Sequence, residues 1–361
     1  MGANRKNIKI TLQEFLTITH EINREEKRTV YKDDKVISSY NSWNDEQRLQ
    51  AFQNLLSRGM LPYYYEFDYY GKDSKKTMAE NEQTFYNKAN ESFPVEIRNS
   101  GDEDVIEKWE NTEKGFVAYL LADGISNCDI GTGYIASNII RKNFIHVLEE
   151  HINESFDDLT YDLVEQMAYQ IVDLSNADIW EESLKFEESS GSIMGSTLIF
   201  LVIYEGGFYY YSLGDSLLYL IREGNMIPLN SPDNAGFLAL RNGKSYAEYR
   251  KMEGKDNIAI YVGGDYARNR SSYYEERCVE TIALKAGDII IASSDGVLDY
   301  YGTKLSDTKW EKEDALAKKL RERKKTLQQR AKAIIQRDNR NGGGDNLSVI
   351  LIEVEGGKDN E

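Results

Sequence analysis

The chain has 361 residues, of which 40% are hydrophobic and 29% are charged, and only 4 are proline. This composition excludes a disordered or collagen-like chain, and the length allows one large domain with a smaller region beside it. With 61 acidic against 44 basic residues, the net charge of −17 argues against general attraction to nucleic acid and favours binding of hard divalent cations. No apolar run reaches the roughly 20 residues that a membrane helix needs, and the polar start lacks a signal-peptide core, so we expect a cytoplasmic protein without a membrane partner.

The cysteine and histidine counts limit the chemistry further. The 2 cysteines, Cys128 and Cys278, cannot form a disulfide framework or a four-cysteine zinc site. Among the 3 histidines, His146 and His151 lie five residues apart on a predicted helix, where they do not share one face well. We interpret both as ordinary helix residues. An enzyme with this sequence would therefore rely mainly on carboxylates.

The first 90 residues differ in character from the rest of the chain. Apolar periodicity predicts helices over 11–29 and 44–58, and Tyr-rich, highly charged stretches lie between and after them. We interpret residues 1–90 as an N-terminal accessory region whose tyrosines pack against the main domain. A separate recognition role for this region is the alternative.

From about residue 94 onward, short apolar runs alternate with Gly, Asp and Asn. This pattern predicts strands at 116–124, 196–207, 208–216, 217–225, 288–296 and 346–354, and helices at 133–152, 157–175 and 311–337. Glu205–Gly207 indicates a hairpin between the second and third of these strands. Because several strands follow one another before helices intervene, the order favours an α+β fold in which helices cover mainly antiparallel sheets.

Acidic motifs lie at the ends of the predicted strands. They are Gly101–Asp104, Ala122–Gly124, Ser294–Gly296 and Gly344–Asn346. One Asp-Gly pair alone is a common turn signal, but strand ends can also direct side chains into a shared cleft. Several partly desolvated carboxylates raise one another's pKa unless a cation neutralises them, and oxygen ligands without His or Cys favour Mg²⁺ or Mn²⁺ over zinc. The pattern therefore predicts a site for divalent cations.

The order and spacing of these motifs resemble the metal-dependent serine/threonine protein phosphatases, the protein phosphatase 2C-like family of bacterial type. The resemblance covers about residues 94–355. The matching elements are Glu103-Asp104, Ala122–Gly124 with Gly133 and Ala136-Ser137, Gly195–Thr197, Ser212–Ser216, Ser294–Asp299 and Asp345–Val349. It implies a four-layer α-β-β-α sandwich, with two mainly antiparallel sheets flanked by helices, in a catalytic domain of residues 91–356.

The resemblance also implies a cofactor, two Mg²⁺ or Mn²⁺ ions, and a set of residues that hold it. Asp123 would bridge the two ions. The remaining ligands would be Glu103, Asp104, Asp295, Asp345 and the carbonyl of Gly124. Many bacterial relatives hold a third ion, for which Asp233 is the nearest match. A hydroxide that bridges the two ions would attack the phosphorus atom without a phosphoenzyme.

The match to the family is less regular among the residues that would bind the phosphate group of the substrate. The family's phosphate-binding arginine is best matched by Arg98, which lies six residues before Asp104 where five are usual. A β-bulge at Gly101 would bring its side chain to the cleft. Leu217 replaces an arginine of the family, and the loop 125–128 replaces a glycine pair.

The function that the resemblance implies is hydrolysis of phosphoserine and phosphothreonine in proteins, a signalling activity with a phosphoprotein as the partner. Asp123, Asp295, Asp345 and Arg98 would be the catalytic residues. Two alternatives stay open: a catalytically weak phosphatase-fold module that binds phosphoproteins or a partner, and a hydrolase of small phosphoesters. Segment 235–257 falls where the family carries a variable flap beside the cleft. Cys128 is either a redox-sensitive thiol near the site or a small loop residue.

Overall fold

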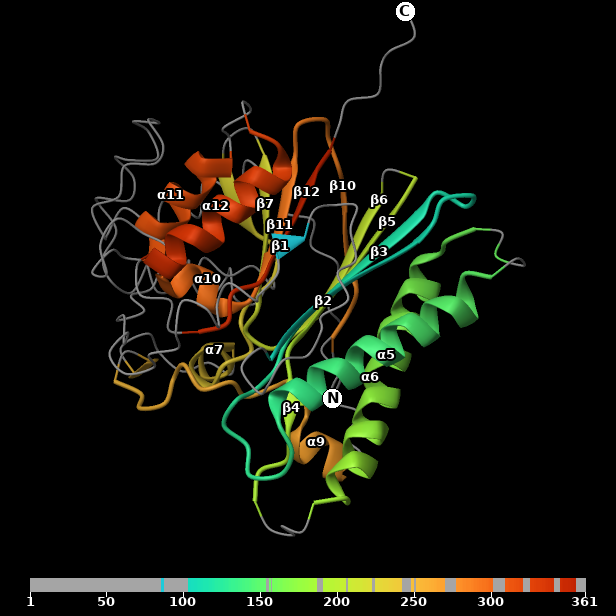
Figure 1. Cartoon of the computed structure of the whole chain (residues 1–361), viewed down its shortest axis with the longest axis vertical. Helices are drawn as coiled ribbons and strands as arrows, with labels where there is room; N and C mark the ends of the chain where they lie inside the picture. Colours follow the sequence, from blue (N-terminus) through green and yellow to red (C-terminus); the bar gives the residue numbers. More distant parts are fainter. Residues whose placement is uncertain are drawn as a thin grey trace, which may run out of the picture.

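The computed structural model describes residues 86–87, 103–153, 156, 158–186, 191–205, 207–222, 225–241, 248–249, 251–269, 277–300, 309–320, 325–340 and 345–354. Within this part of the chain, two five-stranded sheets lie face to face and helices cover both outer faces (Figure 1). This is the four-layer α+β sandwich that the sequence predicts.

The first sheet has the strand order β1-β12-β11-β7-β8. Its strands are β1 (Tyr86–Asn87), β7 (Leu217–Arg222), β8 (Asn225–Pro228), β11 (Ile289–Ser293) and β12 (Val349–Glu353). Neighbouring strands are antiparallel, except that β1 runs parallel to β12. Tyr86 and Asn87 therefore join this sheet, although they lie on the accessory side of the domain boundary predicted near residue 90.

The second sheet has the strand order β10-β6-β5-β3-β2 and is antiparallel throughout. Its strands are β2 (Asp104–Asn111), β3 (Phe116–Asp123), β5 (Leu198–Tyr204), β6 (Gly207–Leu213) and β10 (Glu280–Ala283). Tyr204 pairs with Gly207, so β5 and β6 form the predicted hairpin. A small third sheet pairs β4 (Gly195–Ser196) with β9 (Val262–Gly263).

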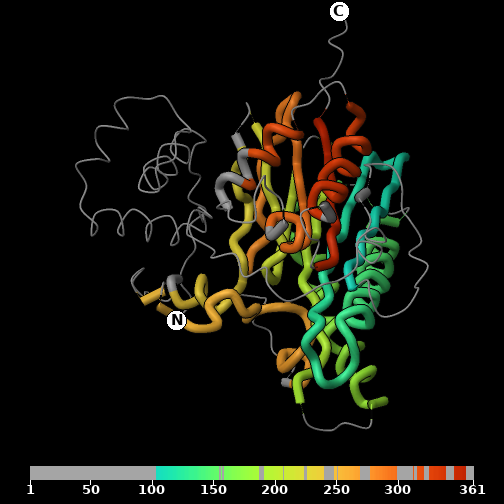
Figure 2. The backbone as a smooth tube through the Cα atoms, turned by 60° about the vertical axis from the view of Figure 1, so that its left-hand side comes forward, coloured from blue at the N-terminus to red at the C-terminus, as the bar shows by residue number. Residues whose placement is uncertain are grey.

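The helices complete the outer layers. They are α5 (Gly133–His151), α6 (Tyr161–Ser183), α7 (Ala235–Arg241), α9 (Gly264–Asn269), α10 (Asp295–Tyr300), α11 (Lys309–Leu320) and α12 (Leu327–Arg340). The pair α5 and α6 covers the second sheet, while α11 and α12 cover the first (Figure 1). Both backbone views place α7, α9 and β4 toward one end of the sandwich (Figures 1 and 2).

Alternation along the strands divides the apolar side chains among three cores. In β3, Leu120 packs against α5 and α6, whereas Leu121 packs against the facing sheet. In β11, Ile291 packs against α11 and α12, whereas Ile290 packs between the sheets. Because successive strand residues point to opposite faces, each central strand is apolar on both sides. This explains why the sequence shows continuous apolar runs rather than strict alternation.

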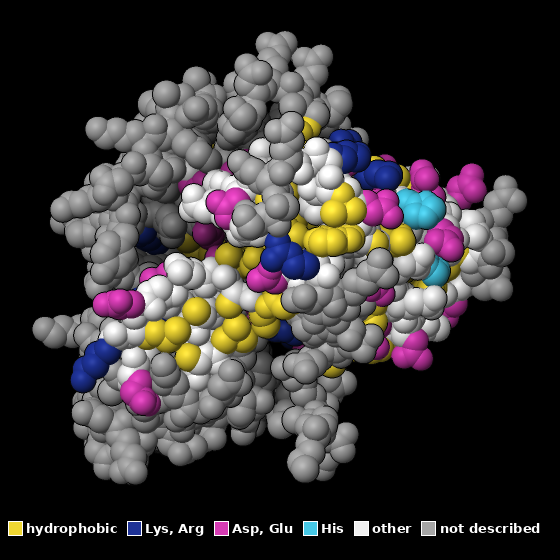
Figure 3. All heavy atoms as spheres, turned by 90° about the horizontal axis from the view of Figure 1, so that it is seen from below, with side chains coloured by type: hydrophobic (Ala, Val, Ile, Leu, Met, Phe, Trp, Pro, Cys, Tyr) yellow, Lys and Arg dark blue, Asp and Glu magenta, His cyan; other side chains and the backbone are white. Residues whose placement is uncertain are grey.

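The end of β3 and the start of β2 lie at the lower end of the second sheet in Figure 1. Figure 3 shows the molecule from below, where acidic, basic and hydrophobic side chains share the described surface. The described histidines lie on α5, where His151 Nε2 is 2.6 Å from Gln170 Oε1 of α6. His151 thus makes an ordinary contact between helices, in agreement with the sequence interpretation.

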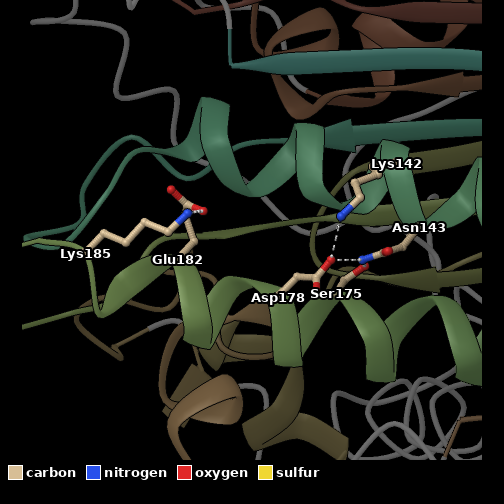
Figure 4. Close-up of polar contacts among 6 residues, drawn as sticks. All are labelled: Lys142, Asn143, Ser175, Asp178, Glu182 and Lys185. Atoms are coloured by element: carbon tan, nitrogen blue, oxygen red, sulfur yellow. Dashed lines mark hydrogen bonds and ion pairs between the residues drawn. The ribbon is translucent and has the colours of Figure 1, made fainter.

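Polar contacts fix α5 against α6 (Figure 4). Asn143 Nδ2 donates to Asp178 Oδ2 at 3.2 Å and lies 3.4 Å from Ser175 Oγ, and Lys142 Nζ lies 3.4 Å from the same Asp178 oxygen. Asn143 is buried, so its amide needs these partners. The two helices are therefore held by directional contacts as well as by the apolar core.

Two helix predictions need correction. The predicted helix 157–175 begins at Tyr161, because the Thr160 side chain caps it, and continues to Ser183. The predicted helix 311–337 is two helices, α11 and α12. The second begins with a reciprocal capping box, in which Thr326 and Gln329 each bind the other's backbone N–H at 3.2 and 3.1 Å.

Several predictions lie outside the described residues. These are the helices at 11–29 and 44–58, the accessory region 1–90 apart from Tyr86 and Asn87, and the position of Arg98. Among the helices that the structure describes, none combines the length and the apolar character needed to cross a bilayer.

Candidate metal centre

Asp123 ends strand β3, and two polar motifs hold its backbone. Its N–H donates to Thr197 Oγ1 at 2.9 Å, and its carbonyl accepts from Thr197 N at 2.8 Å and from Ser196 Oγ at 2.9 Å. Thr197 Oγ1 is in turn 2.8 Å from Ser216 Oγ. The Gly-Ser-Thr and Gly-Asp-Ser motifs of the sequence therefore hold the backbone of Asp123 in place.

Asp104 lies directly opposite Asp123, because β2 and β3 pair in the register that aligns these two residues. Its side chain is 3% exposed. Burial raises the pKa of Asp104 to about 6, a hydrogen bond from Ser348 works against this shift, and the charge of Asp345 adds to it. Ser348 precedes β12 of the other sheet, so Asp104 lies where the ends of the two sheets meet.

Asp295 and Asp345 come together although fifty residues separate them. Asp295 begins α10 directly after β11, and Gly296 packs against the turn that contains Asp345. A Cβ atom on Gly296 would lie 3.1 Å from Asp345 Cβ, which is too close for an ordinary contact. Ser294 and Ser348 exchange hydrogen bonds of 3.1 and 3.0 Å that tie the same two segments.

The charges around Asp123 come from these carboxylates. Burial, followed by the charges of Asp104, Asp295, Asp345 and Asp215, raises the pKa of Asp123 well above its usual range. Four acidic side chains that act on a fifth need positive charge to stay ionised together. Carboxylate oxygens are also the ligands that Mg²⁺ and Mn²⁺ prefer.

The donor set therefore fits hard divalent cations in its chemistry. Among the described residues, no three His, Cys, Asp or Glu side chains already enclose a common ion position. The electrostatic coupling at Asp123, and not a preformed cage, is the observation that supports the site.

The loop after Asp123 is held by close backbone packing. The Gly124 N–H donates to the Glu103 carbonyl at 3.1 Å, and the Glu103 carboxylate accepts a hydrogen bond from Ser126 Oγ. A Cβ atom on Gly133 would lie 2.5 Å from the carbonyl carbon of Gly124 and 2.6 Å from Ile125 N. Only glycine at position 133 lets the start of α5 come this close to the loop. Gly124 and Glu103 thus lie side by side at the acidic end of the sheet.

The surroundings of Cys128 disfavour the thiolate form. Burial raises the pKa of its thiol, and the charges of Glu103 and Asp129 raise it further. The thiol lies 3.5 Å from the Gly131 carbonyl. Because the thiolate is the reactive form, a raised pKa favours the interpretation of Cys128 as a loop residue.

Three further residues discussed in the sequence analysis are Asp233, Leu217 and Arg98. Asp233 is buried and forms an ion pair with Arg277. Leu217 is 3% exposed in β7 and belongs to the core beneath α11 and α12, so its side chain packs there. Arg98 lies outside the described residues.

Sequence reasoning underestimated Asp215 and missed Ser126 and Arg277. Asp215, in the motif Ser212–Ser216, was not among the predicted ligands, yet its charge acts on Asp123. Its place in the motif Gly-Asp-Ser was the available signal. For Ser126 and Arg277 the sequence gives no signal, because their partners are set by loop packing.

Comparison with known proteins agrees with this geometry. The sequence profile of the family described as Protein phosphatase 2C matches residues 96–336. A serine/threonine phosphatase named stp from Listeria innocua is 22% identical over 247 residues, which cover 68% of this chain and 87% of that protein. The serine/threonine phosphatase of S. agalactiae shares the fold with a TM-score of 0.57 and 22% identity, covering 72% of this chain and 96% of that one.

A further solved structure is the catalytic domain of the serine/threonine protein phosphatase PstP in complex with two manganese ions. It has a TM-score of 0.50 and 18% identity, and covers 72% of this chain and 94% of that one. The family profile spans well over half of this chain. The chain therefore belongs to the protein phosphatase 2C family of metal-dependent serine/threonine phosphatases.

Proposed function

We propose that this chain hydrolyses phosphoserine and phosphothreonine in proteins, with Mg²⁺ or Mn²⁺ held at the acidic end of the two sheets. The observation that carries the proposal is the convergence of carboxylates at the sheet ends, where Asp104 lies opposite Asp123 and Gly296 packs against Asp345, and where burial and the neighbouring charges raise the pKa of Asp123. A site of this kind is stabilised by cations and has no structural use without them. The two manganese ions of the PstP structure support a pair of ions here.

We assign to these residues the roles that the family resemblance implies. Asp123 would be shared by both ions, while Asp295 and Asp345 would complete the first. Glu103, Asp104 and the carbonyl of Gly124, which lie together at one end of the paired strands β2 and β3, would serve the second ion directly or through water. When bound, the ions would make a water molecule more acidic, for attack on phosphorus, and would offset charge on the phosphoryl oxygens.

The rigid frame lets this chain hold the carboxylates in place before substrate arrives. Thr197 and Ser216 fix the backbone of Asp123, and Gly296 fixes the approach of Asp295 to Asp345. Arg98 stays the predicted residue for gripping two phosphoryl oxygens, since a guanidinium offers paired donors. If so, Arg98→Ala raises the KM for phosphopeptide several-fold and leaves metal binding unchanged.

The direct test is hydrolysis of a phosphothreonine peptide and of p-nitrophenyl phosphate by the full chain with Mn²⁺, with Mg²⁺ or with EDTA. We expect turnover of both substrates with either metal and none with EDTA. For Asp→Asn variants of the carboxylate cluster, Asp265→Asn is the matched control, because Asp265 is an exposed aspartate that pairs with Arg268 outside the cluster. Turnover in EDTA would contradict the proposal.

The same assay separates the alternatives. Turnover of p-nitrophenyl phosphate without turnover of the peptide would indicate a hydrolase of small phosphoesters. Tight peptide binding without turnover would indicate a binding module.

The division into an accessory region and a catalytic domain of residues 91–356 remains a proposal, as does a cytoplasmic location. Because β1 pairs with β12, a truncation that tests the accessory region should end before Tyr86. We expect such a chain to keep activity on p-nitrophenyl phosphate and to lose preference among phosphoproteins.

A further inference from the structure

Asp233 lies in an electrostatic setting different from that of the acidic site. Its side chain is 1% exposed, and one carboxylate oxygen forms an ion pair with Arg277 Nη2. The other oxygen accepts a hydrogen bond from Gly214 N at 3.2 Å. Because a guanidinium stays charged at any ordinary pH, the pair is neutral as a whole. Both oxygens of Asp233 already have donors from this chain.

The backbone of Asp233 is also fixed. Its N–H donates to the Gly214 carbonyl at 2.9 Å, and its own carbonyl accepts from Ala259 N at 2.8 Å and Ile260 N at 3.1 Å. Asp233 therefore joins the turn after β6 to the segment that leads into β9. A rotation that brought its carboxylate toward another site would break the ion pair and strain these contacts.

Arg277 is held with equal firmness from α6. The Arg277 carbonyl accepts from Tyr169 Oη at 2.6 Å, and two residues later the Val279 carbonyl accepts from Tyr161 Oη at 2.7 Å. The Arg277 side chain is only 16% exposed. Contacts with α6 thus position the backbone segment that carries the Arg277 guanidinium beside Asp233.

The charges of the two regions act on different groups. Asp233 and Arg277 are both among the charges that act on Tyr266, whereas the carboxylates that act on Asp123 are Asp104, Asp295, Asp345 and Asp215. This division agrees with the geometry of the ion pair.

We propose that Arg277 is the counter-charge of Asp233 in place of a third metal ion, and that this ion pair fastens the base of segment 235–257. The inference takes the cation site of the proposed function as given, and it assigns Asp233 to the frame of the molecule. Directly after Asp233, Ala235 N donates to the Asn257 carbonyl at 2.9 Å and Gly236 N to the Lys255 carbonyl at 2.7 Å, which closes the base of the segment.

The proposal has a physical consequence for the segment. If a weakly held metal ion closed the base of segment 235–257, that base would open as the metal concentration fell. A buried ion pair between two residues of the chain does not depend on the metal concentration. Breaking such a pair by removal of one partner leaves a buried charge uncompensated, which proteins tolerate poorly. The base of segment 235–257 should therefore stay closed in metal-free protein.

The test is a count of Mn²⁺ ions bound per chain, by calorimetric titration of the metal-free, full-length protein. We expect wild type and Asp233→Asn to bind the same number of ions with affinities equal within about twofold. Arg277→Ala should gain one weaker ion, because it leaves Asp233 without its guanidinium, and Arg277→Lys should not gain it. Arg268→Ala is the control for loss of an arginine, since Arg268 pairs with the exposed Asp265.

Loss of one ion in Asp233→Asn, or an unchanged count in folded Arg277→Ala, would overturn the proposal. If single variants fail to fold, the double variant Asp233→Leu with Arg277→Met decides, because replacing both partners of a buried pair by apolar residues is often tolerated. That variant should keep the wild-type count, and one ion fewer would refute the proposal. Wild type that binds no Mn²⁺ would instead contradict the proposed function, while the difference between Arg277→Ala and wild type still reports on the ion pair.

Discussion

Two aspartates of this sandwich are equally buried but meet opposite neighbours. Asp288, which directly precedes β11, is 2% exposed and receives Arg222 Nε at 2.9 Å and Arg222 Nη2 at 2.6 Å. Asp104, which begins β2, is 3% exposed, and burial raises its pKa to about 6 with a further contribution from Asp345. The Asp288 carboxylate is neutralised by Arg222, whereas the Asp104 carboxylate lies near the negative charge of Asp345.

The difference separates structural carboxylates from functional ones. A buried carboxylate that is paired with its own arginine is neutralised within the folded chain and needs no cation from solution. A buried carboxylate beside other carboxylates destabilises the fold unless a cation binds. By this criterion Asp233, with Arg277, belongs with Asp288, whereas Asp123 belongs with Asp104.

The largest effect is expected from Asp123→Asn. This change removes the charge at the centre of the carboxylate cluster, so turnover of a phosphothreonine peptide should fall by orders of magnitude while the fold is retained. The Mn²⁺-dependent rise in melting temperature should disappear at the same time. Asp295→Asn and Asp345→Asn should behave similarly, and near-wild-type turnover by these variants would sink the metal-site assignment.

The matching change on the structural side is Asp288→Asn. It leaves the buried Arg222 without its carboxylate partner, which we expect to lower the free energy of unfolding by about 3–5 kcal/mol. Urea unfolding measures this loss. Turnover per folded molecule should stay near that of wild type, and a stable but inactive Asp288→Asn protein would contradict the division into two classes.

A third prediction concerns the loop that carries Gly124. Gly133→Ala would place a Cβ atom 2.5 Å from the carbonyl carbon of Gly124, so either the loop or α5 must shift. We expect roughly tenfold weaker Mn²⁺ binding or lower turnover, equivalent to about 1.4 kcal/mol. Isothermal titration and initial rates measure the two effects.

Gly115→Ala is the matched control for that change. Gly115 has a φ of +65° with open space around it, in the turn between β2 and β3 far along the sheet from Asp123. The substitution should cost about 1–2 kcal/mol of stability through backbone strain, with no effect on Mn²⁺ binding. Equal metal-binding losses in both variants would show that Gly133 has no special position.

The sequence predicted the central layers of the fold well and the edges less well. The runs that became β3, β5, β6, β7, β11 and β12 are apolar on both faces, which makes them easy to recognise. The edge strand β2 was missed because charged residues interrupt it, among them Glu107, which pairs with Arg141 of α5. The break between α11 and α12 depends on the capping contacts of Thr326, which periodicity does not reveal.

For the site, the sequence predicted residues whose motifs lie directly beside apolar strands. Asp123, Asp295 and Asp345 were identified because each sits in an Asp-Gly or Gly-Asp pair beside an apolar run. The setting of Asp233 was not predictable, because Arg277 lies 44 residues away and reaches it through contacts with α6. Motifs report local geometry, whereas the partner of a buried charge is decided by tertiary packing.

The smallest effect that we predict is a pH dependence that metal removes. In metal-free protein the pKa of Asp104 is about 6, above the ordinary 3.8, so the folded chain holds more protons than the unfolded chain between these values. The free energy of unfolding should therefore fall as the pH rises through 6, by about 1 kcal/mol between pH 5 and pH 7. Urea unfolding in EDTA at the two pH values measures it.

Saturating Mn²⁺ should cancel or reverse this trend, because cations bind the ionised carboxylates and thereby stabilise the folded state more at the higher pH. Asp104→Asn has no carboxyl group to titrate at this position, so its metal-free form should lack the part of the pH dependence that comes from Asp104, while Asp123, whose pKa is also raised, keeps its own contribution. Asp265→Asn, an exposed change elsewhere, should retain it. If EDTA-treated and Mn²⁺-loaded wild type showed the same slope of stability against pH, the buried carboxylates would not be the groups that the metal neutralises.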